Sequence, residues 1–191
     1  IYTPEENRQI LQTMLPEAIL TTYNTTDINN KVLEEAVHWA SVIVMGPGSG
    51  QGASVKFILK YLLENTKVPL VVDADGLNCM ANNPQLLENH QASLIVTPHL
   101  GEMARLTGKN VTEIGENIIQ EAENYAKINH LVCVLKDTRT VVTDGKGSVY
   151  LNQSGNHGMA TGGSGDILTG IIAGLLAQGL DLLEAASLGV Y

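Results

Sequence analysis

A glycine-rich segment that ends in an acidic residue is the part of this sequence best suited to chemistry. Residues 156–166 read Asn-His-Gly-Met-Ala-Thr-Gly-Gly-Ser-Gly-Asp and lead into the apolar run 167–176. Glycines permit positive φ and let backbone N–H groups approach a ligand closely, while the positive end of the following helix points at the same place. The segment therefore predicts an anion-binding loop with Asp166 in the first helical turn.

Asp166 has two interpretations. A carboxylate beside a bound phosphate can accept the proton of an attacking hydroxyl group. A carboxylate in the first turn also stabilises the helix end without any catalytic role, and a glycine cluster can be a simple turn. The residues elsewhere in the chain decide which interpretation is preferred.

Two aspartates follow the apolar run 70–72, where a buried strand is expected. Ligands of open α/β sheets bind at the carboxyl ends of strands, so Asp73 is a candidate site residue. For Asp75 we prefer a structural role, as the cap of a helix that begins near Gly76.

Two further strand ends carry polar residues. His99 and Glu102 follow the run 94–96 and are three apart at the start of a helix, so both can project from one face toward the same crevice. A cap or a surface position is the alternative for His99. Lys136 follows the run 131–135 and can act as a point charge for phosphate; the alternative is a solvated lysine beside a hairpin.

A second glycine segment, Gly-Pro-Gly-Ser-Gly at residues 46–50, follows an expected strand and opens a helix. Residues 48–53 also fit the G-x-G-x-x-G/A dinucleotide fingerprint, with Asp73 about 20 residues on as the ribose acceptor. That pattern would indicate a hydride-transferring dehydrogenase. Pro47 constrains the turn, however, and a single fingerprint has many false positives, so a substrate contact and a purely structural turn both stay open.

Short β-branched runs alternate with segments of helical period, which indicates a parallel sheet. The expected strands are 42–45, 70–72, 94–96 and 131–135, and residues 140–143 and 148–151 are expected to form a hairpin at the sheet edge. Thr3-Pro4-Glu5-Glu6 resembles a capping box, so the first helix is expected to begin almost at the first residue. An apolar stripe before residue 131 is expected to be core. Its members are Ile118, Ile119, Ala122, Tyr125 and Ala126.

Composition narrows the class of protein. The 191 residues suffice for one α/β domain, and no repeat or linker divides them. A net charge of −9 with 11 lysines and arginines and no basic cluster disfavours nucleic-acid and anionic-membrane partners. Cys79 and Cys133 lack metal-ligand spacing, and Cys133 is expected to be a buried, reduced thiol. No signal-peptide pattern or bilayer-length apolar run is present, so we expect a cytoplasmic protein.

Four motifs occur together in one order: residues 46–50, 73–78, 97–102 and 156–166. On these motifs the chain, from about Thr3 to its last residue, resembles the ADP- or ATP-dependent NAD(P)H-hydrate dehydratases of the ribokinase-like superfamily. The resemblance implies a three-layer αβα sandwich with a central, mostly parallel sheet and a C-terminal edge β-hairpin. It also implies one domain over 1–191 that lacks an N-terminal strand and glycine loop and part of a C-terminal helix.

The resemblance further implies roles for individual residues. Asp166 would be the catalytic base, and Glu102 would support Mg²⁺ through water. Residues implied in binding hydrated NADH or NADPH are Gly46, Gly48, Gly50, Asp73, His99, Glu102 and Asp166. Residues implied in binding ADP or ATP are Lys136, Asp137, Thr138, Arg139, Thr140, Asn156, His157, Gly158, Met159, Ala160, Thr161, Gly162, Gly163, Ser164 and Gly165.

The implied activity is nucleotide-dependent removal of water from hydrated NADH or NADPH, a lyase reaction that repairs the cofactor, in a homotetramer. One departure argues against a sugar kinase: Ala160 stands where those enzymes carry the first aspartate of their loop. A ribokinase-like kinase of a small alcohol or vitamin precursor and a catalytically silent nucleotide-binding module remain alternatives. The residues do not distinguish ADP from ATP as phosphoryl donor, although we lean to ADP.

Overall fold

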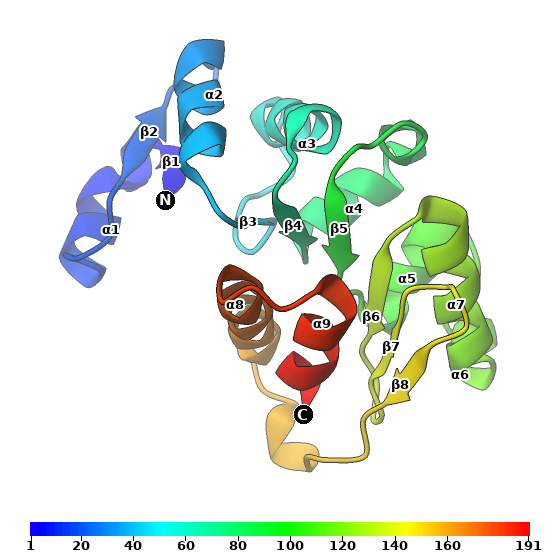
Figure 1. The fold of residues 1–191 in the computed structure, drawn as a ribbon. Helices are drawn as coiled ribbons and strands as arrows, with labels where there is room; N and C mark the ends of the chain where they lie inside the picture. Colours follow the sequence, from blue (N-terminus) through cyan, green and yellow to red (C-terminus); the bar gives the residue numbers. More distant parts are fainter.

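The computed structural model describes residues 1–191, except the side chain of His157. Its centre is a six-stranded sheet in the order β3-β4-β5-β6-β7-β8 (Figure 1). The strands are β3 (Ile43–Met45), β4 (Pro69–Val72), β5 (Ser93–Val96), β6 (Val132–Leu135), β7 (Val141–Thr143) and β8 (Val149–Leu151). Strands β3 to β6 are parallel, and β7 and β8 form an antiparallel hairpin at one edge. The expected mostly parallel sheet with an edge hairpin is confirmed.

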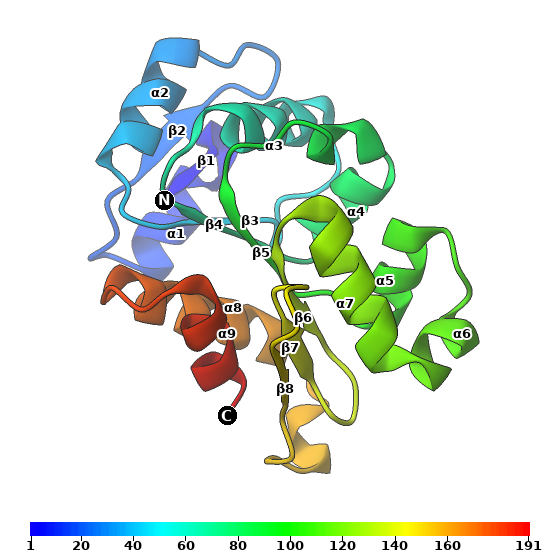
Figure 2. The ribbon, with the colours of Figure 1, turned by 45° about the vertical axis from the view of Figure 1, so that its right-hand side comes forward.

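Helices cover both faces of this sheet, which makes three layers (Figures 1 and 2). One face packs against α3 (Ala53–Asn65), α4 (Asp75–Ala81), α5 (Leu100–Thr107) and α7 (Ile118–Asn129), and the other packs against α8 (Ser164–Ala177) and α9 (Leu182–Val190). Side chains alternate between the two cores along each strand: Leu70 and Val72 of β4 face the first group and Val71 faces the second. The short helix α6 (Val111–Glu116) links α5 to α7.

The N-terminal region differs from expectation. Strands β1 (Tyr2–Pro4) and β2 (Thr21–Tyr23) form a separate two-stranded parallel sheet. A 3₁₀ turn (Glu5–Asn7) precedes α1 (Arg8–Met14). The predicted capping box is wrong, because Thr3 lies in β1 and its hydroxyl instead accepts from the Asn7 side chain. The helix α2 (Asn30–Trp39) then leads to β3. Two further 3₁₀ turns are Pro84–Leu87 and His157–Met159.

The stripe on α7 is core at most of its expected positions. Ala122, Tyr125 and Ala126 are buried, and Ile118 packs against the same cluster. Ile119 is an exception, because it is 41% exposed at the margin of the helix face. Cys133 is buried, as expected, and this burial raises the pKa of its thiol to about 12.

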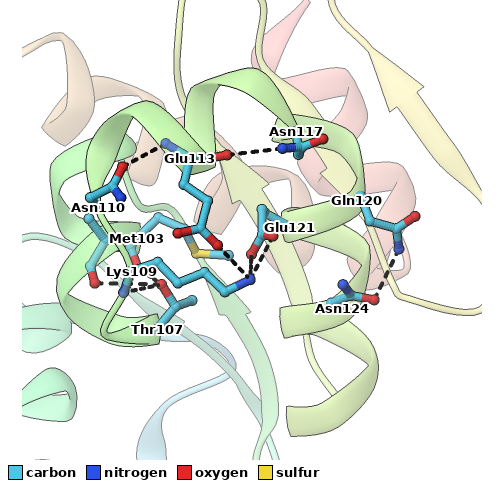
Figure 3. A network of polar contacts seen from close by, with 10 residues as sticks. Met103, Thr107, Lys109, Asn110, Glu113, Asn117, Gln120, Glu121 and Asn124 are labelled. Atoms are coloured by element: carbon cyan, nitrogen blue, oxygen red, sulfur yellow. Dashed lines mark hydrogen bonds and ion pairs between the residues drawn. The ribbon is translucent and has the colours of Figure 1, made fainter.

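An ion-pair network fixes α5, α6 and α7 to one another (Figure 3). The Lys109 ammonium, just after α5, lies 2.7 and 2.8 Å from the two carboxylate oxygens of the buried Glu121 on α7. Glu113 of α6 lies 3.6 Å from the same ammonium. In the part of the chain that the structure describes, the helices are too short or too polar to cross a membrane.

Candidate active site

The carboxyl ends of the four parallel strands are joined by backbone hydrogen bonds. The N–H of Asp73 donates to Met45 at 3.1 Å, that of Thr97 donates to Val72 at 3.3 Å, and that of Lys136 donates to Pro98 at 2.7 Å. Each bond connects the residue after one strand to the neighbouring strand end. The segments that the sequence singled out therefore meet along one edge of the sheet.

The first glycine segment contains one tightly packed glycine and two open ones. Gly46 has φ +125°, and a methyl group there would lie 1.8 Å from the carbonyl oxygen of Asp73. Gly48 and Gly50 have φ of +63° and +73°, and a methyl group on either would meet open space. A packing role accounts for Gly46, whereas Gly48 and Gly50 present an open loop at the start of α3, whose N-cap, Gly52, has no side-chain acceptor.

Asp75 does not cap α4, so this prediction is wrong. The N-cap is Ala74, and Asp75 is the first helical residue. The Asp75 carboxylate instead accepts from the N–H of Gly50 at 2.9 Å and lies 3.5 Å from the Gln51 amide nitrogen. It thus fastens the open glycine loop to α4.

The turn between the two aspartates is strained. Ala74 has φ +47° and ψ −116°, and the N–H of Gly76 donates to the carbonyl of Asp73 at 3.0 Å. This is the conformation of the first central residue of a type II′ turn, which glycine adopts most easily. Strain of this kind concentrates at functional sites, where the surrounding structure enforces it.

His99 and Glu102 form a reciprocal capping box at the start of α5. The Nδ1 atom of His99 accepts from the N–H groups of Gly101 and Glu102, and a Glu102 carboxylate oxygen accepts from the N–H of His99 at 2.9 Å. The cap that the sequence left open for His99 is thus present. The His99 side chain is 55% exposed, and its Nε2 atom lies 3.6 Å from a carboxylate oxygen of the buried Glu102.

The helix α8 begins differently, without any side-chain cap. Its N-cap is Gly163, with φ +89°. Because the first N–H groups of a helix lack intrahelical acceptors, those of Gly165 and Asp166 are left without an intrahelical partner at an uncapped end. Asp166 lies in the first turn, as predicted, and its side chain is exposed. A helix end without a side-chain cap is suited to an anion.

The rest of the loop leads to this helix end from β8. The Asn156 side chain accepts from the N–H of Gly158 at 2.9 Å, and the Ser164 hydroxyl donates to the carbonyl of Thr161 at 2.9 Å. The side chain of His157 lies outside the described part of the structure. Exposed loop residues at which a ligand could contact the backbone or side chain are Gly158, Met159, Ala160, Thr161, Gly162 and Gly163.

Asp73 and Lys136 lie beneath the first turn of α8. Asp73 is 2% exposed, and its carboxylate lies 3.1 Å from the Lys136 ammonium and 3.0 Å from the hydroxyl of Thr169 on α8. The solvated alternative for Lys136 is wrong, since the side chain is 21% exposed and ion-paired. Because Asp73 is almost fully buried and each of its oxygens already has a partner, it is poorly placed to accept a ribose hydroxyl, which argues against the dinucleotide fingerprint.

The residues after Lys136 line the same edge. Asp137, Thr138 and Arg139 are exposed and Thr140 is half-buried, in the connection from β6 to β7. They follow a strand end beside the α8 loop, and this is consistent with a position next to a nucleotide. Their contacts within the protein are sparse: the Thr138 hydroxyl donates to Asp137 at 3.4 Å.

The donor set is suited to Mg²⁺ that arrives on a nucleotide. Among the described residues, no cluster of three or more histidine, cysteine, aspartate or glutamate side chains could hold a metal ion. Mg²⁺ is typically bound through one or two carboxylates together with substrate phosphates and water. Glu102 offers one carboxylate for water-mediated contact with such an ion, without a closed protein cage.

A cavity of about 900 Å³ lies next to this edge but does not contain the chemistry. Apolar side chains of the N-terminal region and of β3 line most of it, among them Tyr2, Leu33 and Ile43. It reaches the site only at Gly46–Ser49, and neither Lys136 nor Asp166 borders it.

The contacts of three residues at the site, Thr169, Asn78 and Asp75, were not predicted from the sequence. Thr169 is the only polar residue in the run 167–176, and that isolation was the available signal. Asn78 accepts at 2.9 Å from Arg105, which ties α4 to α5, and Asp75 holds Gly50. For these two contacts the sequence gives no signal, because they depend on how neighbouring helices pack.

Comparison with known proteins finds relatives described as NAD(P)H-hydrate dehydratases or repair enzymes. The family model described as NAD(P)H-hydrate dehydratase matches residues 1–191. The bifunctional NAD(P)H-hydrate repair enzyme of Moorella thermoacetica is 45% identical over 159 residues, which is 83% of this chain and 30% of that protein. The ADP-dependent (S)-NAD(P)H-hydrate dehydratase of Neisseria meningitidis serogroup B is 40% identical over 151 residues, covering 78% of this chain and 51% of that protein.

Solved structures agree with the sequence comparison. The ADP/ATP-dependent NAD(P)H-hydrate dehydratase of Bacillus subtilis, co-crystallised with ATP/Mg²⁺, superposes with a TM-score of 0.77 at 29% identity, covering 99% of this chain and 65% of that one. A ribokinase-like superfamily protein of Enterococcus faecalis superposes with a TM-score of 0.81, also at 29% identity, over 99% of this chain and 64% of that one. The chain spans about a third of the Moorella relative and about two thirds of these two solved structures.

Proposed function

Because the chain belongs to the NAD(P)H-hydrate dehydratase family, we propose that its site removes water from hydrated NADH or NADPH at the expense of ADP or ATP. One observation carries this proposal: α8 begins without a side-chain cap, and the exposed Asp166 lies in its first turn. Such an end can bind a phosphoryl group and place a base beside it.

In the proposed reaction, the hydroxyl on C6 of the nicotinamide ring attacks the terminal phosphoryl group of the nucleotide, and Asp166 accepts its proton. The N–H groups at the start of α8 stabilise the negative charge that develops on the phosphoryl oxygens. Phosphate then leaves with its C–O bond electrons as the lone pair of the ring nitrogen forms an iminium bond to C6. Loss of a proton from C5 to the departing phosphate or to water forms the C5–C6 double bond and restores the dihydropyridine. The products are NADH or NADPH, inorganic phosphate and AMP or ADP.

Binding roles follow from position along the sheet edge. Gly48, Gly50, which Asp75 holds in place, and the exposed side chain of His99 would contact the hydrated nicotinamide. The nucleotide would lie between the Lys136–Thr140 segment and the loop 156–165. Mg²⁺ would supply charge neutralisation on the phosphates, with Glu102 orienting its water ligands. ADP is our preferred donor, since the dehydratase of Neisseria meningitidis, 40% identical, is ADP-dependent.

Asp166→Asn tests the assignment of the base. The amide keeps the size of the side chain but accepts a proton poorly, so turnover should fall by at least about 100-fold, while ADP and ATP binding stays within about twofold. Purified protein would be mixed with hydrated NADH, Mg²⁺ and either nucleotide, following reduced-nicotinamide absorbance and phosphate release. Wild-type turnover by this variant would exclude Asp166 as the base.

The same assay separates the alternatives. A kinase would yield a stable phosphorylated product instead of free phosphate, and a silent module would bind nucleotide without either product. Recovery of absorbance with only one nucleotide identifies the donor. We also propose a homotetramer in the cytoplasm; the two buried, unpaired cysteines are consistent with a reducing compartment, and light scattering measures the assembly.

A further inference from the structure

The buried carboxylate of Asp73 lies under the N-terminal end of α8. Asp73 is 2% exposed, and a charge so far from water is costly unless its oxygens are paired. One oxygen lies 3.1 Å from the Lys136 ammonium and the other lies 3.0 Å from the Thr169 hydroxyl. The pairing joins the ends of β4 and β6 to α8.

The hydroxyl of Thr169 donates its hydrogen bond to Asp73 in preference to the backbone of its own helix. It lies 3.0 Å from the Asp73 carboxylate and also 3.0 Å from the carbonyl of Gly165, but it carries a single proton. The ionised acceptor forms the stronger bond, so the proton points to Asp73. Thr169 therefore fixes the carboxylate, and the carboxylate fixes Lys136.

The Lys136 ammonium lies against the first turn of α8. A methyl group on Gly165 would be 3.4 Å from the Lys136 nitrogen and 3.6 Å from a carboxylate oxygen of Asp73. A larger side chain at 165 would separate the ammonium from the helix end. Among the described residues its hydrogen-bond acceptor is Asp73, and an ammonium has three N–H donors, so donors remain for an anion bound there.

We propose that Asp73 is a positioning residue, which holds Lys136 under the α8 end so that the ammonium contacts the polyphosphate of the nucleotide. This inference rests on the proposed function only in placing a nucleotide at that end. Asp73 acts through Lys136 and does not itself contact the substrate, in contrast to the substrate contact expected from the sequence. The carboxylate lowers the cost of burying the cation before the nucleotide arrives, and it prevents Lys136 from turning to solvent.

Three variants test the proposal: Asp73→Asn, Lys136→Met and the double variant. Each single change leaves one charge of a buried pair without its partner, so both should lower the unfolding temperature. The double variant removes both charges and should recover much of that loss. Affinity for ADP and for ATP, measured by calorimetry without hydrate, should fall about tenfold or more in all three, including the double variant.

The recovery of stability without recovery of affinity distinguishes positioning from a merely structural pair. Overturning results are wild-type nucleotide affinity in Asp73→Asn, or a double variant that regains both stability and affinity. If Asp73→Asn fails to fold, Thr169→Val decides, because it keeps both charges and removes only the hydroxyl that fixes the Asp73 carboxylate; wild-type nucleotide affinity in that variant would then overturn the proposal. Thr169→Val is the milder companion, expected to weaken nucleotide binding less than Asp73→Asn.

The outcome separates this inference from the proposed function. Lys136-dependent nucleotide binding without any NADH recovery would overturn the dehydratase activity and leave the positioning role supported. NADH recovery that is unaffected in Asp73→Asn, at unchanged nucleotide KM, would overturn the positioning role alone.

Discussion

At the scale of single residues, the site depends on backbone contacts that tolerate no side chain. Gly46→Ala would place a methyl group 1.8 Å from the Asp73 carbonyl, at φ +125°. The β4–α4 turn that carries Asp73 and Asp75 must then move, so we expect a loss of roughly 2–4 kcal/mol in the free energy of unfolding, measured by urea denaturation. The proposed dehydratase activity should fall in the fraction that remains folded.

Gly48→Ala is the matched control for this prediction. Gly48 also has positive φ, +63°, but a methyl group there meets open space. The left-handed conformation alone should cost about 1–2 kcal/mol. Equal losses for the two variants would contradict the packing role of Gly46.

The sequence predicts which residues reach the sheet edge better than it predicts their partners. The residues Asp73, His99, Lys136 and Asp166 were identified because strand ends and glycine loops leave local signals. The role of Asp75 was not, because a carboxylate at a helix start looks like a cap in the sequence, and only the packing of α4 against the loop reveals Gly50 as its donor. Local pattern does not contain such long-range contacts.

At the scale of elements, the ends of the strands can be predicted from the sequence pattern, whereas the junctions between helices cannot. The four parallel strands were found because short β-branched runs are distinctive. Strands β4, β5 and β6 are largely buried on both faces, whereas Val44 of the edge strand β3 is 41% exposed. The N-terminal capping box failed because the residues 2–4 pair with 21–23 across the chain, and this pairing overrode the local helix signal at Thr3. The junction of α5 with α7 likewise includes a contact that local pattern does not predict, the ion pair of Lys109 with Glu121 shown in Figure 3.

Lys109→Met should therefore loosen α7. The change leaves the buried Glu121 carboxylate without the ammonium that lies 2.7 Å away, so the unfolding temperature should fall by a few degrees. The partnership with Glu121 raises the pKa of Lys109 above its ordinary value of 10.5. The stabilisation by this ion pair is then complete below about pH 10 and is lost as pH rises through the raised pKa of Lys109. Thermal unfolding at alkaline pH should therefore show that the difference in unfolding temperature between wild type and Lys109→Met becomes smaller.

The control for this junction is Lys60→Met on α3. Lys60 and Glu64 are 3.7 Å apart and both are exposed, so their separation should leave the unfolding temperature nearly unchanged. Lys109→Met combined with Glu121→Gln should recover part of the loss, because no charge is then left buried. A single variant as stable as the wild type would show that the network does not hold α7.

At the scale of the whole molecule, the site is assembled from chain segments that are far apart in sequence. Five segments meet at one edge of the sheet because four parallel strands end there: 46–50, 73–75, 99–102, 136–140 and 156–166. The helix α8 is joined to the end of β4 by the hydrogen bond from Thr169 to Asp73. A ligand that contacts several of these segments binds the folded protein and not the unfolded chain. Nucleotide binding must therefore stabilise the molecule as a unit.

Thermal unfolding with ADP or ATP and Mg²⁺ measures this coupling. At a nucleotide concentration about 100 times Kd, mass action contributes about 2.7 kcal/mol, which corresponds to a rise of roughly 5–10 °C in Tm for a chain of this size. Asp166→Asn should show nearly the same rise, since its carboxylate accepts a proton but is not needed to hold the phosphates. Lys136→Met should show a smaller rise, because an ammonium contact is lost. A full rise in Lys136→Met together with none in Asp166→Asn would reverse the two roles, and would place the phosphates at Asp166 and not above the pair that Asp73 anchors.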